Sequence, residues 1–318
     1  MKLFFTLSFI FLFTSTGFSQ VVFYLKKNGR YTNQPDSAYY TRVINEPDSG
    51  SVLYDVTEFY KNGNRKLVGK STKVDPPIYE GQRVIYYESG LRQNLSTFNK
   101  GDKVGNSYEY FTNGNLYRVI KYPDVPVKAS IESEYDIIAS FDSLGVEYVK
   151  EGEGDYKGYS DNFKYVEETG KVHNGKREGV WTGKKENIHS TFTETYKNGE
   201  LISGVSVNDK NESFNYKGNR GTPPDFKGGY MGFGKYLSNN IVYPTYARKN
   251  LIEGRVILTF VVEKDGKLSD VKVLKSADPV LDDEAVRVLE KSPKWLPGII
   301  MGQPVRVQYS VPVNFALK

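Results

Sequence analysis

The chain carries two copies of one pattern, Gly81-Gln-Arg-Val-Ile-Tyr-Tyr-Glu-Ser-Gly90 and Gly105-Asn-Ser-Tyr-Glu-Tyr-Phe-Thr-Asn-Gly114. Both glycines and the aromatic pair between them recur after 24 residues, as expected of a structural repeat. An aromatic pair on a strand directs one ring to each face, and the glycine that follows supplies the positive φ of a tight reversal. We therefore expect consecutive β-hairpins that stack into an extended antiparallel sheet.

Weaker copies of this pattern extend the repeat region in both directions. The ending recurs in Phe59-Tyr-Lys-Asn-Gly63 and Thr195-Tyr-Lys-Asn-Gly199, and a related opening is Asn174-Gly-Lys-Arg-Glu-Gly-Val-Trp181. Short aromatic and β-branched segments alternate with turn signals throughout, so we assign residues 21–218 to one β-hairpin domain. Over roughly residues 52–202 the pattern resembles the MORN-type repeat, which implies a scaffold that binds lipids or proteins in some members.

The composition limits the chemistry open to the chain. Its 318 residues favour two domains, and 25 Tyr with 18 Phe favour strands over helices. Lys and Arg (43) interleave with Asp and Glu (38) and form no long basic run, which argues against a nucleic-acid partner. There is no Cys, and His173 and His189 are the only histidines, so thiol chemistry is excluded and zinc has almost no ligands. We predict no catalytic residues, no cofactor and no metal site, and therefore a protein that is not an enzyme.

Residues 1–20 have the pattern of a signal peptide. Lys2 gives the charged start, an apolar stretch occupies residues 3–13, and small residues lead to Ser19. An uncleaved membrane anchor is the alternative, but a span needs about 20 apolar residues and this run is shorter. We expect cleavage near Ser19 or Gln20, and a location in the periplasm or cell envelope.

The last part of the chain, residues 230–318, changes to a mixed pattern of helices and strands. It follows a Gly- and Pro-rich stretch at residues 219–229, which we predict to be a linker. Apolar residues at helical spacing predict a short helix over residues 231–241. A second helix is predicted behind the N-cap residue Asp278, where a proline and several acidic residues occupy the first turn.

Three strands complete this predicted domain. A buried strand begins at Arg255, and Lys264-Asp-Gly-Lys267 is typical of a two-residue hairpin turn that leads into a partner strand over residues 268–274. Residues 305–317 alternate strictly between apolar and polar side chains. This alternation predicts one long strand with one buried face and one exposed face.

Several short motifs in this domain agree with one another in order and spacing: Tyr243-Pro244, Glu253-Gly254, Trp295-Leu-Pro-Gly298, Gly302-Gln-Pro-Val305 and Val311-Pro-Val-Asn-Phe315. Through them, residues 228–318 resemble the C-terminal domain of TonB. The resemblance implies a small α+β domain with a three-stranded antiparallel sheet and two helices, so the whole chain is classed as β-rich α+β. It also implies an exposed edge strand that captures the "TonB box" peptide of an outer-membrane transporter.

The chain departs from an energy-transducing TonB at its N-terminal end. Such a protein is expected to keep a membrane helix that carries a His, followed by a long Pro-rich spacer. Here the hydrophobic start, residues 1–20, contains no His, and the repeat domain stands where the spacer would be. The resemblance therefore favours the binding step over energy coupling.

The last strand is the candidate binding site. If it lies at a sheet edge, its unpaired N–H and C=O groups can bond an incoming peptide strand. Pro312 has no N–H, so its side should face outward, together with the main-chain groups of Arg306, Gln308 and Ser310. We predict that the partner binds along Val305, Arg306, Val307, Gln308, Tyr309, Ser310 and Val311.

Two functions follow from these patterns. The first is a periplasmic, non-catalytic adaptor that binds a protein partner in the cell envelope, such as an outer-membrane TonB-dependent transporter, so that any membrane association is indirect. The alternative is a cell-envelope structural protein whose MORN-like repeats bind lipid, glycan or a protein partner. Two plainer interpretations stay open. Pro312 protects the edge from pairing, so that no partner binds there, or the aromatic rings of the repeats only fill a core.

Overall fold

The computed structural model describes residues 20–125 and 135–317. The chain divides into two compact units, a first unit that ends at Glu147 and a second unit that begins at Tyr148.

Two sequence predictions reach beyond the described residues. The predicted signal peptide lies outside them except for Gln20, which begins the first strand. Residues 126–134 of the predicted repeat domain also lie outside.

Strands β1 to β9 are Gln20–Leu25, Tyr40–Asn45, Tyr54–Tyr60, Arg65–Ser71, Tyr79–Tyr86, Arg92–Asn99, Asp102–Tyr110, Leu116–Tyr122 and Asp136–Phe141. Strands β10 to β16 are Glu147–Lys150, Glu153–Tyr159, Val166–His173, Lys176–Lys185, Ser190–Lys197, Glu200–Asn208 and Ser213–Gly218. Strands β17 to β22 are Gly221–Thr222, Gly254–Val262, Leu268–Lys275, Gly298–Ile300, Gln303–Val305 and Val307–Phe315. The α-helices α1 to α3 are Gly229–Asn240, Thr245–Lys249 and Pro279–Glu290, and two short 3-10 helices are Pro35–Ser37 and Glu186–Ile188.

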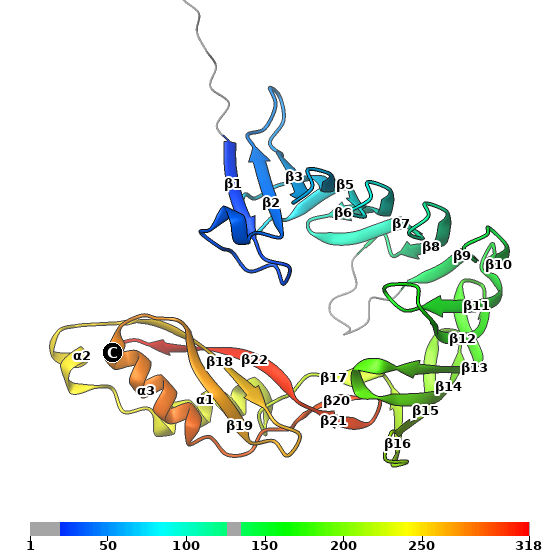
Figure 1. Ribbon diagram of the computed structural model, residues 1–318. Coiled ribbons are helices and arrows are strands. Elements are labelled where there is room, and N and C mark those ends of the chain that lie inside the picture. Colours follow the sequence, from blue (N-terminus) through cyan, green and yellow to red (C-terminus); the bar gives the residue numbers. More distant parts are fainter. Residues whose placement is uncertain (1–19, 126–134, 318) are drawn as a thin grey trace, which may run out of the picture. The chain divides into compact units, whose positions relative to one another are not determined.

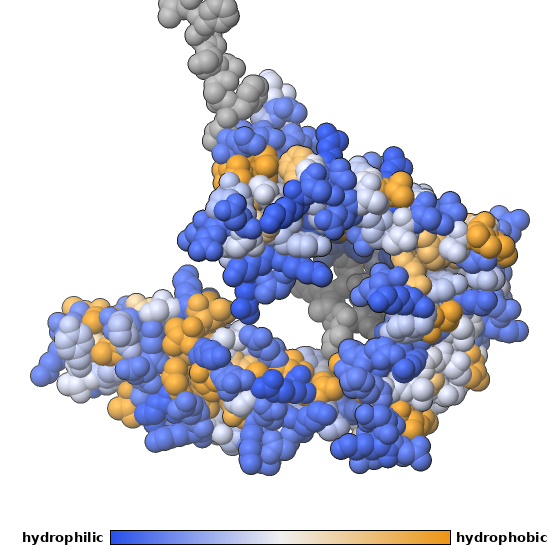
Figure 2. Space-filling view, in the orientation of Figure 1, coloured by the Kyte–Doolittle hydropathy of each residue, from blue (hydrophilic) through white to orange (hydrophobic). Residues whose placement is uncertain are grey.

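Strands β1 to β16 form a long antiparallel sheet in which each strand follows its sequence neighbour (Figure 1). The prediction of a strand-rich region is thereby confirmed. On the face shown in Figure 2, hydrophobic residues are interspersed among hydrophilic ones. This mixture is ordinary for a sheet with exposed polar side chains.

The repeated glycines of the first unit adopt one conformation. Gly63, Gly90 and Gly114 have φ angles of +87°, +88° and +89°. The N–H of each donates to the carbonyl three residues earlier, for example from Gly63 to Tyr60 at 2.9 Å. Because this positive φ is accessible to glycine at little cost, the turn residue recurs wherever a repeat reverses.

Tyrosine and asparagine side chains of the turns join each repeat to the next. The Tyr60 hydroxyl donates to the carbonyl of Tyr86 at 2.8 Å, and the Tyr87 hydroxyl donates to that of Tyr110 at 2.5 Å. The Nδ2 of Asn62 donates to the carbonyl of Glu88 at 3.0 Å. Main-chain carbonyls at the turns are therefore satisfied by the neighbouring repeat, as buried and half-buried polar groups require.

In the second unit, glycines make room for rings on adjacent strands. A Cβ on Gly170 of β12 would lie 2.2 Å from the indole of Trp181 on β13. That indole is fully buried, and its Nε1 donates to the carbonyl of Lys171 at 3.0 Å. Gly204 gives the same room to Tyr216 on β16.

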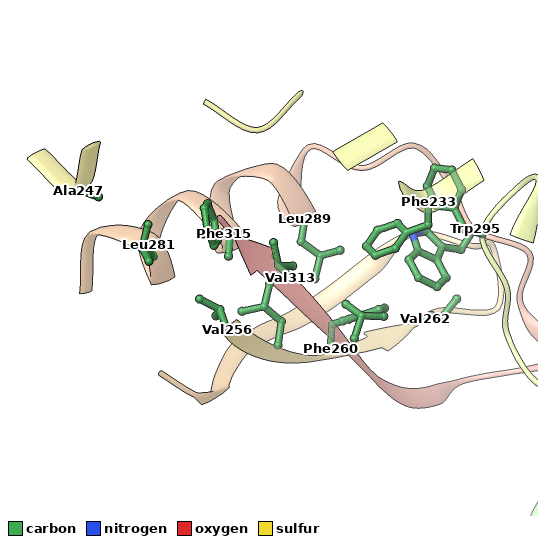
Figure 3. Packing of buried hydrophobic residues seen from close by; sticks show 14 residues of the cluster. Phe233, Ala247, Val256, Phe260, Val262, Leu281, Leu289, Trp295, Val313 and Phe315 are labelled. Atoms are coloured by element: carbon green, nitrogen blue, oxygen red, sulfur yellow. The ribbon is translucent and has the colours of Figure 1, made fainter. Parts of the chain in front are cut away.

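The C-terminal domain is a three-stranded antiparallel sheet in the order β19-β18-β22, with α1 and α3 packed on its apolar face. Phe233 and Trp295 lie at one end of the core, and Ala247 and Leu281 lie at the other (Figure 3). The predicted sheet and its two main helices are confirmed, and α2 adds a single short turn. The Asp278 side chain accepts from the N–H of Val280 at 3.0 Å, as the predicted N-cap requires.

The hairpin between β18 and β19 differs in one detail from its prediction. The N–H of Glu263 donates to the carbonyl of Lys267 at 2.8 Å, which leaves three residues, 264–266, in the connection. Gly266 has a φ of +82°, whereas Asp265 does not adopt a positive φ. A two-residue type I′ turn needs positive φ at both central positions, so the turn has the three-residue form.

The segment that we predicted to be a linker, residues 219–229, is folded instead. Within it, β17 pairs with β20, and β20 pairs with β21, giving a second small sheet. Arg220 and Phe226 are buried, Phe226 in the core of the C-terminal domain. The composition is typical of a linker, but two buried side chains and a strand pairing hold these residues in place.

Candidate functional site

Strand β22 lies at the edge of the C-terminal sheet. It pairs with β18 along its whole length, from Val307 opposite Val262 to Phe315 opposite Gly254. Within residues 20–125 and 135–317, β18 is the one strand that pairs with it. The other side of β22 therefore carries main-chain groups that no described strand takes up.

The register indicates which residues direct those groups outward. Pro312 lies opposite Ile257, and since proline has no N–H, this pair is expected to be the kind that exchanges no ladder bonds. The Tyr309 carbonyl accepts from the Thr259 hydroxyl at 3.3 Å, so it faces β18. Main-chain direction alternates along a strand, and Gln308 and Ser310 accordingly direct their N–H and C=O groups away from β18.

The two faces of β22 follow the predicted alternation. Val311, Val313 and Phe315 are buried, whereas Gln308 and Ser310 are exposed. The amide of Gln308 donates to the Thr259 hydroxyl at 3.0 Å on the polar face of the sheet. This side-chain bond leaves the main chain at the edge unaffected.

The predicted binding stretch, Val305 to Val311, is divided by the structure. Val305 belongs to β21, where it pairs with Gly298 of β20. Arg306 lies between β21 and β22, and its guanidinium is 2.9 Å from Glu263 and 2.8 Å from Asp270. The prediction of one continuous strand over residues 305–317 was wrong, because the first residues pair in the second small sheet.

Aromatic packing beneath β22 fixes the position of the edge. The Trp295 ring lies 5.2 Å from that of Phe260 and 6.0 Å from that of Tyr309, centroid to centroid. Its Nε1 donates to the Ser292 hydroxyl at 3.0 Å. A rigid edge loses little conformational entropy when a peptide binds to it.

The second unit contains an ionic cluster that the sequence patterns did not predict. The Nη2 of Arg220 is 2.5 Å from Glu194 and 3.0 Å from Glu168, and Arg177 is 2.6 Å from Glu168. Burial alone would raise the pKa of the Glu168 carboxyl, but Arg177 and Arg220 hold that pKa well below its usual range. The sequence contains one signal that could have indicated this cluster. Glu194 stands five residues before a turn glycine, as Glu58 does, so a glutamate recurs at the same position of two repeats.

The hairpin of β20 and β21 contacts strands β14 and β15 through a second set of polar groups. The amide of Gln303 donates to the hydroxyls of Ser190 at 2.8 Å and Ser206 at 2.9 Å. The Ser206 hydroxyl donates to the carbonyl of Met301 at 2.7 Å. These bonds join the hairpin to repeat strands within the second compact unit.

Comparison with known proteins identifies the C-terminal domain. Residues 239–317 match the family model described as Gram-negative bacterial TonB protein C-terminal, which confirms the predicted resemblance for this domain. Two NMR solution structures of Helicobacter pylori TonB-CTD are similar to this part of the chain, each at 26% identity and a TM-score of 0.23. Each alignment covers 28% of this chain, and 79% of the longer fragment or 92% of the shorter one. No curated protein gives a significant match to the chain.

The MORN-like character of the repeat region stays a prediction. The predicted absence of a cofactor likewise stays a prediction. Among the described helices, none combines the length and the apolar character that crossing a membrane requires.

Proposed function

We propose that this chain is a non-catalytic adaptor of the bacterial periplasm whose C-terminal domain binds an extended segment of a protein partner by adding it as a strand to β22. The observation that supports this proposal most is that β22 pairs with β18 alone among the described strands, while Gln308 and Ser310 direct their main-chain groups outward. The family match over residues 239–317 supports an outer-membrane TonB-dependent transporter as the partner.

Strand addition at this edge provides a small number of main-chain hydrogen bonds. Each contributes roughly 0.5–1.5 kcal/mol net, so the few outward groups between Val307 and Val311 support a weak or moderate affinity. The bonds end at Pro312, which offers no N–H to an added strand. Binding is thus confined to the first half of β22.

Several features support the remaining parts of this proposal. The recurring turns at Gly63, Gly90 and Gly114 favour a MORN-like scaffold as the partner of the C-terminal domain. Contacts from Gln303 and Arg220 hold that domain against the last repeats. The pattern of residues 1–20 supports export to the periplasm with cleavage of a signal peptide.

The test is an NMR titration of the full chain, labelled with 15N at serine and glutamine, with a transporter-derived TonB-box peptide. We expect the amide signals of Gln308 and Ser310 to shift most, because these N–H groups gain a bond. Signals that do not move in this stretch while the peptide binds elsewhere would remove the proposed mode of recognition.

A matched pair of variants separates the main chain from the side chain. Ser310→Pro deletes the outward N–H and should weaken peptide binding several-fold, since roughly 0.5–1.5 kcal/mol is lost with one hydrogen bond. Ser310→Ala keeps the N–H and should bind as the wild type does. Equal affinity of the two variants would count against strand addition.

A further inference from the structure

Three successive repeats of the first unit differ at one position. Glu58, Ile85 and Glu109 each stand five residues before the glycine of their hairpin turn. The middle repeat therefore has an apolar side chain where its neighbours have a carboxylate. Ile85 lies opposite Leu67, and Leu67 lies opposite Glu58, so these residues share one face of the sheet.

Both carboxylates of the flanking repeats are paired with cations. Glu58 is buried, and Arg42 lies 2.8 Å and Lys66 2.5 Å from its oxygens. Glu109 is half-buried, and its Oε2 is 2.9 Å from the Nε of Arg118. The sheet thus holds a glutamate side chain against cations on the same face in two separate places, with two cations at Glu58 and one at Glu109.

The middle repeat has a cation, Arg83, on this face but no glutamate at the equivalent position to pair with it. Arg83 precedes Ile85 by two residues on β5 and so projects from the same face. Its guanidinium carbon lies 4.8 Å from the ring centroid of Tyr79 and 4.2 Å from that of Phe98. Its Nε is buried, and no hydrogen-bond acceptor among the described residues reaches it.

A glycine on the neighbouring strand, β4, leaves room for the aliphatic part of the Arg83 side chain. A Cβ on Gly69 of β4 would lie 3.1 Å from the Cγ of Arg83 and 3.3 Å from the Tyr79 ring. A larger residue at this position would displace the arginine from the rings. The two aromatic rings and the space above Gly69 together fix the position of the guanidinium.

A second cation lies nearby on β7. Lys103 pairs with Phe98, and its Nζ lies 5.1 Å from the centroid of the Tyr122 ring and 3.3 Å from its hydroxyl. Burial lowers the pKa of Lys103, Glu109 raises it, and the positive charge of Arg83 lowers it again. Burial likewise lowers the pKa of Arg83, whereas Tyr79 and Glu58 raise it to a smaller extent.

No described carboxylate forms a direct ion pair with either of these two cations. In residues 20–125 and 135–317, neither Arg83 nor Lys103 takes part in an ion pair, because Glu58 and Glu109 are engaged by other partners. Two half-buried like charges without a direct ion-pair partner are costly to the folded state, although Glu58 and Glu109 attract them from a distance. A bound carboxylate would remove that cost and bond to the free donors of the guanidinium.

We propose that Arg83 and Lys103 form a binding site for an acidic peptide segment, with a glutamate side chain of the ligand in the role that Glu58 and Glu109 have in the flanking repeats. A peptide is favoured because the same face already holds two glutamate carboxylates in ion pairs with Arg or Lys side chains. The site lies in the first unit and is independent of β22.

Isothermal titration calorimetry of the full chain with a capped oligo-glutamate peptide tests the proposal. We expect Arg83→Gln to weaken binding about ten-fold or more, since a hydrogen bond to a charged group is worth roughly 1.5–3 kcal/mol, and Lys103→Gln to weaken it less. Arg92→Gln and Lys121→Gln serve as controls of equal charge change, because both residues are exposed and Lys121 projects from the opposite face. Unchanged affinity in Arg83→Gln overturns the site.

Restoring the missing carboxylate gives a second test. Ile85→Glu should pair with Arg83 and abolish peptide binding, whereas Ile85→Gln, of similar shape without the charge, should retain it. Equal binding by these two variants contradicts the proposal. Inorganic phosphate that competes as well as the peptide at equal concentration would show a general oxyanion site and overturn the peptide assignment. The Ser310→Pro variant should bind the oligo-glutamate peptide normally, which keeps this test separate from that of β22.

Discussion

The Nη2 of Arg220 lies 2.5 Å from the Oε2 of Glu194, and both side chains are buried. The Nε of the same guanidinium donates to Glu194 as well, at 2.9 Å from Oε1. On the main-chain side, the carbonyl of Arg220 accepts from the N–H of Met301 at 2.5 Å. One residue therefore joins a repeat strand, β14, to the hairpin of β20 and β21 in the C-terminal domain.

Removal of this arginine should be strongly destabilising. Arg220→Ala leaves the buried carboxylate of Glu194 and the largely buried carboxylate of Glu168 with less compensation, and breaking one partner of a buried pair costs about 3–5 kcal/mol. Urea unfolding followed by tryptophan fluorescence, to which the buried Trp181 and Trp295 both contribute, would measure the loss. Lys184→Gln removes an exposed ion pair of similar length and should have little effect. A small change in Arg220→Ala would mean that water or relaxation replaces the pair.

Acid should destabilise the second unit through Glu168. Arg177 and Arg220 overcome the effect of burial and hold the pKa of its carboxyl below the ordinary value, so the folded state binds the proton less readily than the unfolded chain. This contribution is present above the unfolded pKa, about 4.3, and is lost progressively as the pH falls below it. Free energies of unfolding measured from about pH 6 to pH 3 should fall less steeply in Glu168→Gln than in the wild type. Parallel pH profiles would show that other carboxyls dominate acid unfolding.

Two glycine-to-alanine changes should have opposite signs. Gly170→Ala places a methyl group 2.2 Å from the Trp181 ring and should destabilise by about 1–3 kcal/mol through overpacking. Gly234 lies in the middle of α1 with no atom within 4 Å of a new Cβ. Gly234→Ala should therefore stabilise by roughly 1 kcal/mol, since glycine is a poor helix former. Thermal unfolding of both variants checks the signs, and a neutral Gly170→Ala would require the indole to move.

Replacement of the edge proline should extend the binding strand. Pro312→Ala adds an N–H on the outward side of β22 without removing a bond to Ile257. Peptide affinity should then increase by the value of one hydrogen bond, roughly 0.5–1.5 kcal/mol. A calorimetric titration of the variant with the TonB-box peptide measures this gain, and an unchanged dissociation constant would place the peptide elsewhere.

Local patterns predicted much of the fold because their causes lie within a few residues. Gly63 and Gly90 mark reversals, since few other residues tolerate that φ, and Asp278 caps α3 by bonding the N–H two residues on. The alternation along β22 predicted its buried face for the same reason. The predicted start of that strand was wrong, because no pattern in the neighbouring residues indicates that Val305 pairs with Gly298 in another sheet.

The candidate site was predictable in part. Pro312 and the alternation point to β22, whereas its place at the edge is a property of the sheet order β19-β18-β22. The Arg83 and Lys103 site could not be found from the sequence, because both residues look like ordinary surface cations. Their lack of a direct ion-pair partner emerges only from the structure, in which Glu58 and Glu109 pair with Arg42, Lys66 and Arg118.

Sequence alone was sufficient for the repeated hairpins, the capped helix and the apolar face of the last strand, since turn conformation, capping and side-chain periodicity act between residues close in the chain. Tertiary structure decided that residues 219–229 are folded and that Gln303 bonds Ser190 and Ser206. It also decided which strand is left at the edge. These outcomes depend on burial and on partners far away in the chain, so their free energy exists only once the chain has brought those groups together.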